Sequence, residues 1–198
     1  ENLVPGHPIA GSEKSGISAA NAELFVNHKV ILTPTVETSE QALALVKQMW
    51  METGASLATM SVEEHDEVLA ATSHLPHILA YALVDALAGR EEQRKIFEYA
   101  AGGFRDFTRI AASDPVMWRD VFLNNKDAVL EILQRFTEDL TALQKAIRRG
   151  DGTYMHDTFA RTRDIRKAII DQGQAEYKAP AGETREGVPP VKAGSQEG

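Results

Sequence analysis

The hydrophobic pattern of this chain changes once, near Met60, and that change limits what the chain can fold into. Before it, residues 29–35 and 55–60 are short apolar runs typical of buried strands. A helical repeat lies between them, with Thr38 or Ser39 in position to cap its first turn. Two strands joined by a helix are typical of a parallel sheet. We therefore expect a small α/β piece followed by an all-helical part.

The second part carries apolar residues at helical spacing throughout. Ser61 and Glu64 form a capping box for a helix over residues 62–88, and Pro76 inside it predicts a kink or break near His74. Further helices are expected over residues 91–99 (ended by the pair Gly102 and Gly103), from Pro115 onward, over 124–149 and over 153–171. Their apolar faces exceed what so short a segment can bury internally, which predicts a homodimer. The Pro- and Gly-rich stretch over residues 173–198 is expected to be a disordered tail or a linker.

Composition excludes several classes of protein. The 198 residues carry a net charge of −8, which argues against a nucleic-acid or anionic-membrane surface. They include no cysteine, so disulfides and thiolate metal sites are excluded. No apolar run approaches the roughly 20 residues that span a bilayer, and a cytoplasmic protein is expected.

A histidine stands in a polar segment bounded by glycine and proline, ahead of the first expected strand. Pro8 fixes the backbone after His7, and the flanking glycines allow close approach of a ligand. A lone loop histidine is most often exposed or held by structural hydrogen bonds, whereas this one could accept a proton from a substrate hydroxyl. The short loop keeps Glu13 near it, together with Ser12.

Two further histidines share one face of the expected helix. His74 and His77 are three residues apart, a spacing that suits a metal, a substrate, or capping and buried hydrogen bonds at the Pro kink. Zinc needs a third ligand, and His65 and Asp66 lie eight or more residues back. Substrate binding is therefore preferred to metal binding.

A third polar segment contains Arg109. Its guanidinium could form a surface ion pair with Asp106, or clamp a substrate carboxylate in a bidentate fork. Arg105 and Arg119 are competing candidates for the clamp. Trp118 is more often a core residue than a ligand wall.

Together these segments resemble a known family. GHPIAGSEKSG at residues 6–16, SHLPH at 73–77 and GGFRDFTRIA at 102–111, extended by residues 113–120, are similar to prephenate dehydrogenases of tyrosine biosynthesis. The resemblance covers about residues 1–170 in the family's order and spacing.

The resemblance implies a mainly α fold, in which a C-terminal all-helical dimerisation domain follows a short α/β remnant of a Rossmann nucleotide-binding domain. It assigns residues 1–60 to the remnant and 61–172 to the helical substrate-binding domain. It also implies oxidative decarboxylation of prephenate to 4-hydroxyphenylpyruvate with NAD or NADP. The alternatives are an arogenate dehydrogenase that forms tyrosine, and a non-catalytic dimerisation or tyrosine-sensing module.

The same resemblance assigns roles to residues of the site. His7 resembles the catalytic histidine that accepts a hydrogen bond from the ring hydroxyl, Arg109 a carboxylate-binding arginine, and His77 a contact to the pyruvyl side chain. The other substrate-binding positions are Glu13 and Asp106, which control access and orient Arg109; Gly102 and Trp118, pocket-lining residues that a dimer partner can supply; His74, near the feedback inhibitor tyrosine; and Ser12.

One hallmark of the family is missing from the sequence. No G-x-G-x-x-G fingerprint follows a strand, and no acidic ribose-binding residue can be placed. We therefore expect the main cofactor-binding residues to lie before Glu1. The chain should bind dinucleotide weakly and have little activity alone.

Overall fold

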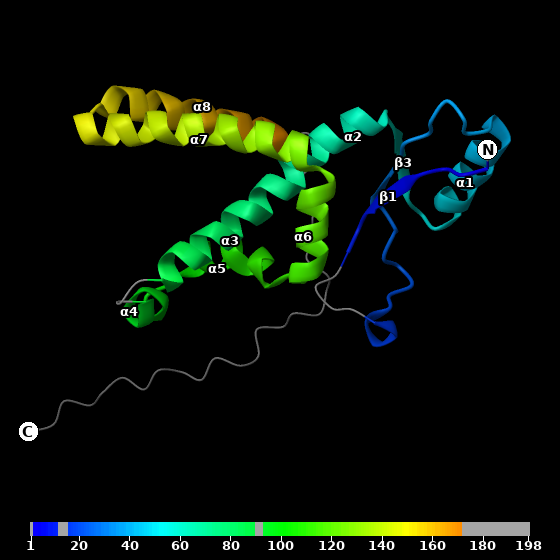
Figure 1. Ribbon diagram of the computed structural model, residues 1–198, viewed down its shortest axis with the longest axis horizontal. Coiled ribbons are helices and arrows are strands. Elements are labelled where there is room, and N and C mark those ends of the chain that lie inside the picture. Colours follow the sequence, from blue (N-terminus) through cyan, green and yellow to red (C-terminus); the bar gives the residue numbers. More distant parts are fainter. Residues whose placement is uncertain (1, 12–15, 90–92, 172–198) are drawn as a thin grey trace, which may run out of the picture. The chain divides into compact units, whose positions relative to one another are not determined.

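The computed structural model describes residues 2–11, 16–89 and 93–171 (Figure 1). The expectations for Ser12, Glu13 and the tail from residue 173 therefore fall outside the described residues. The chain divides into two compact units, Glu1–Glu138 and Asp139–Gly198.

The first unit begins with a small mixed sheet in the order β1-β2-β3. Strand β1 (Gly6–Ile9) is antiparallel to β2 (Lys29–Leu32), and β2 is parallel to β3 (Ser56–Thr59). Helix α1 (Glu40–Glu52) connects the parallel pair, as the strand–helix–strand pattern predicts.

Local sequence explains how this connection begins and ends. Ser39 caps α1 by accepting a hydrogen bond from the Ala42 amide at 3.2 Å. After α1, Gly54 turns the chain with φ of 82°, a conformation that glycine adopts without strain. Behind the strands lies a small core around Val30, Leu32 and Ala55, against which partly buried side chains pack: Phe25, Leu43, Val46, Trp50 and Leu57.

His7 lies on a strand, so the expectation of a loop was wrong. It pairs with Ile31 of β2, a partner 24 residues away whose effect no local pattern reveals. Gly6 makes the close pairing possible, because a Cβ there would lie 2.9 Å from Leu32 Cδ2.

The long helix after the sheet continues through its proline. Helix α2 (Val62–Leu69) starts at Ser61, whose hydroxyl accepts from the Glu64 amide, and α3 (Leu75–Ala88) follows a π-helical turn, η2 (Ala70–His74). Pro76 has no N–H to donate and clashes with a regular α-helical carbonyl. The wider turn absorbs that conflict, so the expected irregularity near His74 is confirmed without a break.

Shorter elements complete the first unit. The described ones are η1 (Ile17–Ala19), α4 (Gln93–Glu98), α5 (Gly102–Thr108), η3 (Arg109–Ala112) and α6 (Pro115–Asn124). Gly102 and Gly103 open α5, so the expected interruption falls just before them. Asp114 caps α6 through the Met117 amide at 2.8 Å.

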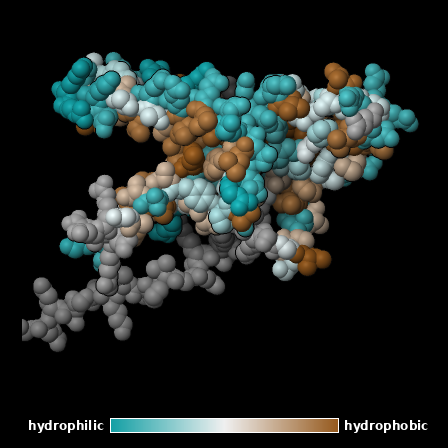
Figure 2. All heavy atoms as spheres, in the orientation of Figure 1, coloured by the Kyte–Doolittle hydropathy of each residue, from teal (hydrophilic) through white to brown (hydrophobic). Residues whose placement is uncertain are grey.

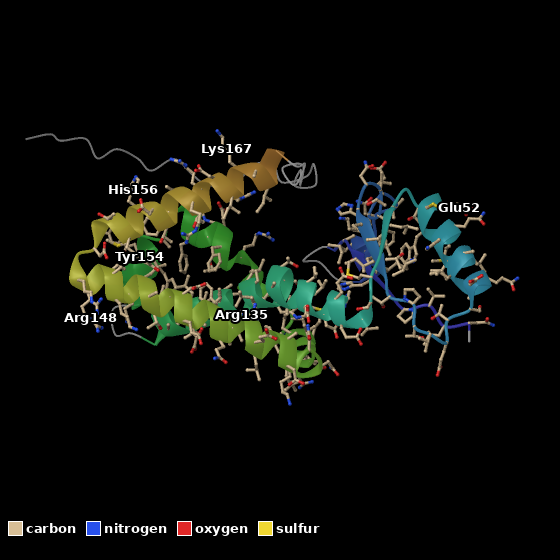
Figure 3. All side chains as sticks on the ribbon, turned by 90° about the horizontal axis from the view of Figure 1, so that it is seen from above. Glu52, Arg135, Arg148, Tyr154, His156 and Lys167 are labelled. Carbon is tan, nitrogen blue, oxygen red and sulfur yellow. The ribbon has the colours of Figure 1, made fainter. Side chains whose placement is uncertain are left out.

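The second unit is a helical hairpin. It contains the end of α7 (Lys126–Arg149) and α8 (Gly152–Asp171), joined where Gly150 adopts φ of 66°. Figure 3 labels Arg148 on α7 and Tyr154, His156 and Lys167 on α8. In residues 2–11, 16–89 and 93–171, no helix combines the length and apolar character needed to cross a membrane.

Candidate active site

Four histidines of the first unit gather around the end of the sheet and the start of the long helix. His7 comes from β1, His65 from α2, His74 from the π turn and His77 from the first turn of α3. We call His7, His65, His74 and His77 the histidine cluster. Three of them were candidates from the sequence, and the fold brings these three together.

The first pair joins the sheet to the helical part. His7 Nδ1 and His65 Nε2 form a hydrogen bond of 2.9 Å, and their ring centroids are 5.2 Å apart. The other nitrogen of His65, Nδ1, lies 2.8 Å from Asp66 Oδ1. A continuous polar chain therefore runs from β1 to a carboxylate on α2.

Asn125, the residue after α6, ties the cluster to the later helices. Its side-chain amide donates to the Asp66 backbone carbonyl at 2.8 Å and lies 3.2 Å from His74 Nδ1. His74 is 9% exposed, so this amide supplies a partner that the buried ring needs.

An aromatic wall lies beside the cluster. His77 stacks on Trp118 with ring centroids 3.6 Å apart and an interplanar angle of 22°, and its Nδ1 donates to the Ser73 carbonyl at 2.8 Å. Trp118 is 8% exposed and also contacts His74 and Phe122 edge-on or tilted. Its Nε1–H is buried and finds no hydrogen-bond acceptor in the described part of the chain.

Burial lowers the pKa of three imidazoles of the cluster and so favours their neutral form. It lowers the pKa of His74 below the ordinary value; the carboxylate of Asp66 opposes this, and the rings of His65, His7 and His77 add to it. Burial is also the main cause of the lowered pKa of His7, with His65 second, and of the lowered pKa of His77. Neutral imidazoles can accept protons near neutral pH.

The remaining sequence candidates lie on a different element. Gly102 and Asp106 belong to α5 and Arg109 starts η3, and both elements pack against α3. The Tyr81 hydroxyl fastens this packing by donating to the Ser113 carbonyl at 3.0 Å. Helix α3 thus carries His77 of the histidine cluster and also packs against the elements that contain Asp106 and Arg109.

Sequence reasoning set aside two residues that the structure places in the cluster. The sequence offers His65 and Asp66 only as distant metal ligands, yet His65 contacts His7 across 58 residues of sequence, and Asp66 contacts the other side of the His65 ring. The adjacent His–Asp pair in a predicted helix was the one available signal. Within the described ranges, no group of three His, Cys, Asp or Glu residues could hold a metal ion.

These features define a class of protein: an α/β nucleotide-domain segment followed by a helical domain, with polar groups collected where β1 meets the first long helix. Residues 1–59 match the family description "Prephenate dehydrogenase, nucleotide-binding domain", and residues 61–161 match "Prephenate dehydrogenase, dimerization domain". The chain belongs to the prephenate dehydrogenase family, so the resemblance seen in its motifs and the expected fold class are confirmed.

Individual relatives agree with this assignment. The chain is 46% identical over 169 residues to a cyclohexadienyl dehydrogenase of Zymomonas mobilis, covering 84% of this chain and 58% of that protein. The crystal structure of an Aquifex aeolicus prephenate dehydrogenase in complex with hydroxyphenyl propionate and NAD+ matches with a TM-score of 0.79 and 44% identity, over 84% of this chain and 58% of that one. A Synechocystis arogenate dehydrogenase structure matches with a TM-score of 0.75 and 29% identity, over 85% of this chain and 62% of that one. The chain thus spans less than two thirds of these relatives.

Proposed function

We propose that the protein carrying this sequence oxidatively decarboxylates prephenate to 4-hydroxyphenylpyruvate, with NAD+ as hydride acceptor, in L-tyrosine biosynthesis. The observation that carries the proposal is the placement of His7, an imidazole with a lowered pKa that hydrogen-bonds to His65 at the start of the helical domain of a family member. NADP+ as the cofactor is a finer proposal that the same assay can test.

His7 is the proposed proton acceptor. As the substrate's ring hydroxyl becomes a carbonyl, its proton passes to the imidazole, whose lowered pKa favours the neutral, proton-accepting form. Loss of CO2 then sends the electron pair of the broken C–C bond through the ring to the carbonyl oxygen, which regains the proton from the imidazole. The ring becomes aromatic, and this supplies the driving force. The contribution of the chain is therefore to position the substrate and to hold one proton, which it returns to the product's ring oxygen.

The described residues do not supply a complete cofactor site. The parallel pair β2 and β3 with α1 fits the edge of a nucleotide-binding sheet, but the sequence holds no glycine-rich phosphate loop. NAD+, when bound, takes the hydride from the hydroxyl-bearing carbon. We expect weak NAD+ binding by the 198-residue chain alone, and micromolar binding in a fluorescence titration would contradict this.

The other site residues keep the roles that the family suggests, as proposals. Arg109 and His77 would bind the carboxylate and the pyruvyl side chain. Support comes from α3, which carries His77 and packs against the segment that contains Arg109. The same proposal covers the remaining positions: Ser12, Glu13, His74, Gly102, Asp106 and Trp118.

We also propose the domain division 1–60, 61–172 and 173–198, and a homodimer formed by the helical domain. Large apolar side chains stay exposed on the second unit, among them Ile147 at 67% and Phe159 at 57%. Figure 2 shows hydrophobic side chains exposed among hydrophilic ones on the face that it draws. Faces of this kind are normally covered by a partner. Tyrosine as a feedback inhibitor would act at the same site.

Steady-state kinetics test the proposed reaction. In the protein carrying this sequence, His7→Asn should reduce kcat by about 10²- to 10⁴-fold, the usual contribution of a general base. His156→Asn is the matched control, because that histidine is exposed on α8 and should leave the rate unchanged. Equal rates for wild type and His7→Asn would refute the role of His7.

Arogenate dehydrogenation is the second candidate, favoured by the similarity to the Synechocystis structure. Measuring kcat/KM for prephenate and arogenate with each dinucleotide decides between the substrates. A non-catalytic tyrosine-sensing module would show no turnover with either substrate, and its gene would not complement a tyrosine auxotroph.

A further inference from the structure

The hydrogen bonds of the cluster determine which nitrogen of His7 carries a proton. His7 uses Nδ1 to reach His65 Nε2 at 2.9 Å, and His65 uses Nδ1 to reach Asp66 Oδ1 at 2.8 Å. An ionised carboxylate only accepts hydrogen bonds, so His65 Nδ1 must be the donor.

The rest follows from the single N–H of a neutral imidazole. When His65 Nδ1 carries the proton, its Nε2 holds a lone pair and accepts. His7 Nδ1 must then be the donor of the 2.9 Å bond, which leaves the lone pair of His7 on Nε2. That nitrogen is the one not used by His65.

We propose that His65 and Asp66 are a positioning pair that holds His7 in the Nδ1–H tautomer, with Nε2 free to take the substrate's hydroxyl proton. The catalytic part rests on the proposed function, while the tautomer itself is a property of the folded chain. An imidazole in water exchanges between its two tautomers, and only one of them presents a lone pair at Nε2.

Two features show that the pair is built into the fold. His65 is 19% exposed at its side chain and Asp66 is 44% exposed, so the contact is partly shielded from water. The backbone of Asp66 is held independently, because its carbonyl accepts from the Asn125 amide at 2.8 Å. The chain thus fixes the carboxylate-bearing residue before any ligand binds.

The sequence contains a matched control for this arrangement. His156 and Asp157 are also adjacent on a helix, with Nδ1 3.1 Å from the carboxylate, but their side chains are 80% and 69% exposed. The same dipeptide therefore occurs once against His7 and once in solvent.

Nitrogen NMR of the histidine side chains in the 198-residue chain tests the tautomer directly. We expect His7 in the wild type to carry its proton on Nδ1. His65→Phe keeps a ring but removes the acceptor and should leave His7 as a mixture of tautomers, as should Asp66→Ala. His65→Gln retains an amide acceptor and should restore Nδ1–H, and His156→Phe should change nothing at His7.

Either of two spectra would overturn the proposal: Nε2–H on wild-type His7, or an unchanged Nδ1–H signal in both His65→Phe and Asp66→Ala. Because this measurement needs no substrate, it stands even if prephenate is not turned over.

Kinetics test the consequence for catalysis. His65→Phe should lower kcat by at least about tenfold with little change in KM, within the roughly 10⁴-fold loss that a wrong histidine tautomer causes in serine proteases. His65→Gln should recover most of that loss. An unchanged kcat in a His65→Phe protein whose His7 tautomer has been lost would refute the positioning role.

Discussion

Replacing Trp118 with alanine should destabilise the helical part of the first unit. The indole is 8% exposed, stacks on His77 at 3.6 Å and meets His74 and Phe122 on its other edges. Its removal leaves a cavity beside the histidine cluster. The surrounding helices can relax into this cavity only partly.

The size of the effect is set by two opposing contributions. Truncating a buried aromatic side chain to alanine typically costs about 3–5 kcal/mol, including the cavity. The substitution also removes the buried Nε1–H, whose missing acceptor costs about 1–3 kcal/mol in the wild type. From the midpoints of these two ranges, the expected net loss in the free energy of unfolding is therefore about 2 kcal/mol.

Urea unfolding followed by circular dichroism and by fluorescence measures this loss. Trp50 is the other tryptophan and packs in the sheet core, so it reports on the sheet in every variant. Trp118→Phe keeps a stacking ring and deletes the unpaired N–H, and it should lie within about 1 kcal/mol of wild type. Val116→Ala on the same helix, 54% exposed, should change the free energy by less than about 0.5 kcal/mol.

A loss below about 1 kcal/mol for Trp118→Ala, at an unchanged slope against urea concentration, would refute the packing argument. If Trp118→Phe were as destabilising as Trp118→Ala, the indole N–H would have an acceptor after all.

Three further predictions concern pH and local structure. The free energy of unfolding should fall as the pH drops below about 6.5, the ordinary pKa of histidine. His7, His74 and His77 have lowered pKa values in the folded state, so the unfolded chain binds more protons there. The loss begins near the unfolded-state pKa and is complete below the folded-state pKa values. Urea titrations at about pH 7.5 and 5.5 check this, and equal midpoints would contradict it. Asn125→Ala should cost about 1–3 kcal/mol, because it removes the side-chain partner of His74 and one of the two donors to the Asp66 carbonyl. Asn124→Ala changes an exposed side chain and should cost less than about 0.5 kcal/mol in the same titration. Gly150→Ala should lower the free energy of unfolding by about 1 kcal/mol, because Gly150 has a φ of 66°, which alanine adopts only with strain. Gly152 has no such φ and a Cβ there would meet no other atom, so Gly152→Ala should leave the thermal melt unchanged.

Much of the fold could be read from local patterns. The caps at Ser39 and Ser61 stand in the sequence as polar side chains beside helical repeats, and the structure uses both of them. Such signals act over three or four residues, so they are visible in one segment at a time.

The candidate site was only partly readable. His7, His74 and His77 stood out because each lies in a polar motif, and the fold brings them together. Asn125 carried no signal, because its importance comes from partners 51 and 59 residues away. The pairing of β1 with β2 was also missed, since four residues that include a proline show no strand alternation.

The sequence by itself determined the division into an α/β piece and a helical part, because hydrophobic periodicity and capping are local properties. It also supplied the candidate groups for proton transfer and substrate binding, among them His7, His77 and Arg109. Only the tertiary structure decided that His65 meets His7 and that Asn125 donates to the carbonyl of Asp66, the neighbour of His65. Those contacts depend on distances across different elements, which a linear spacing does not encode.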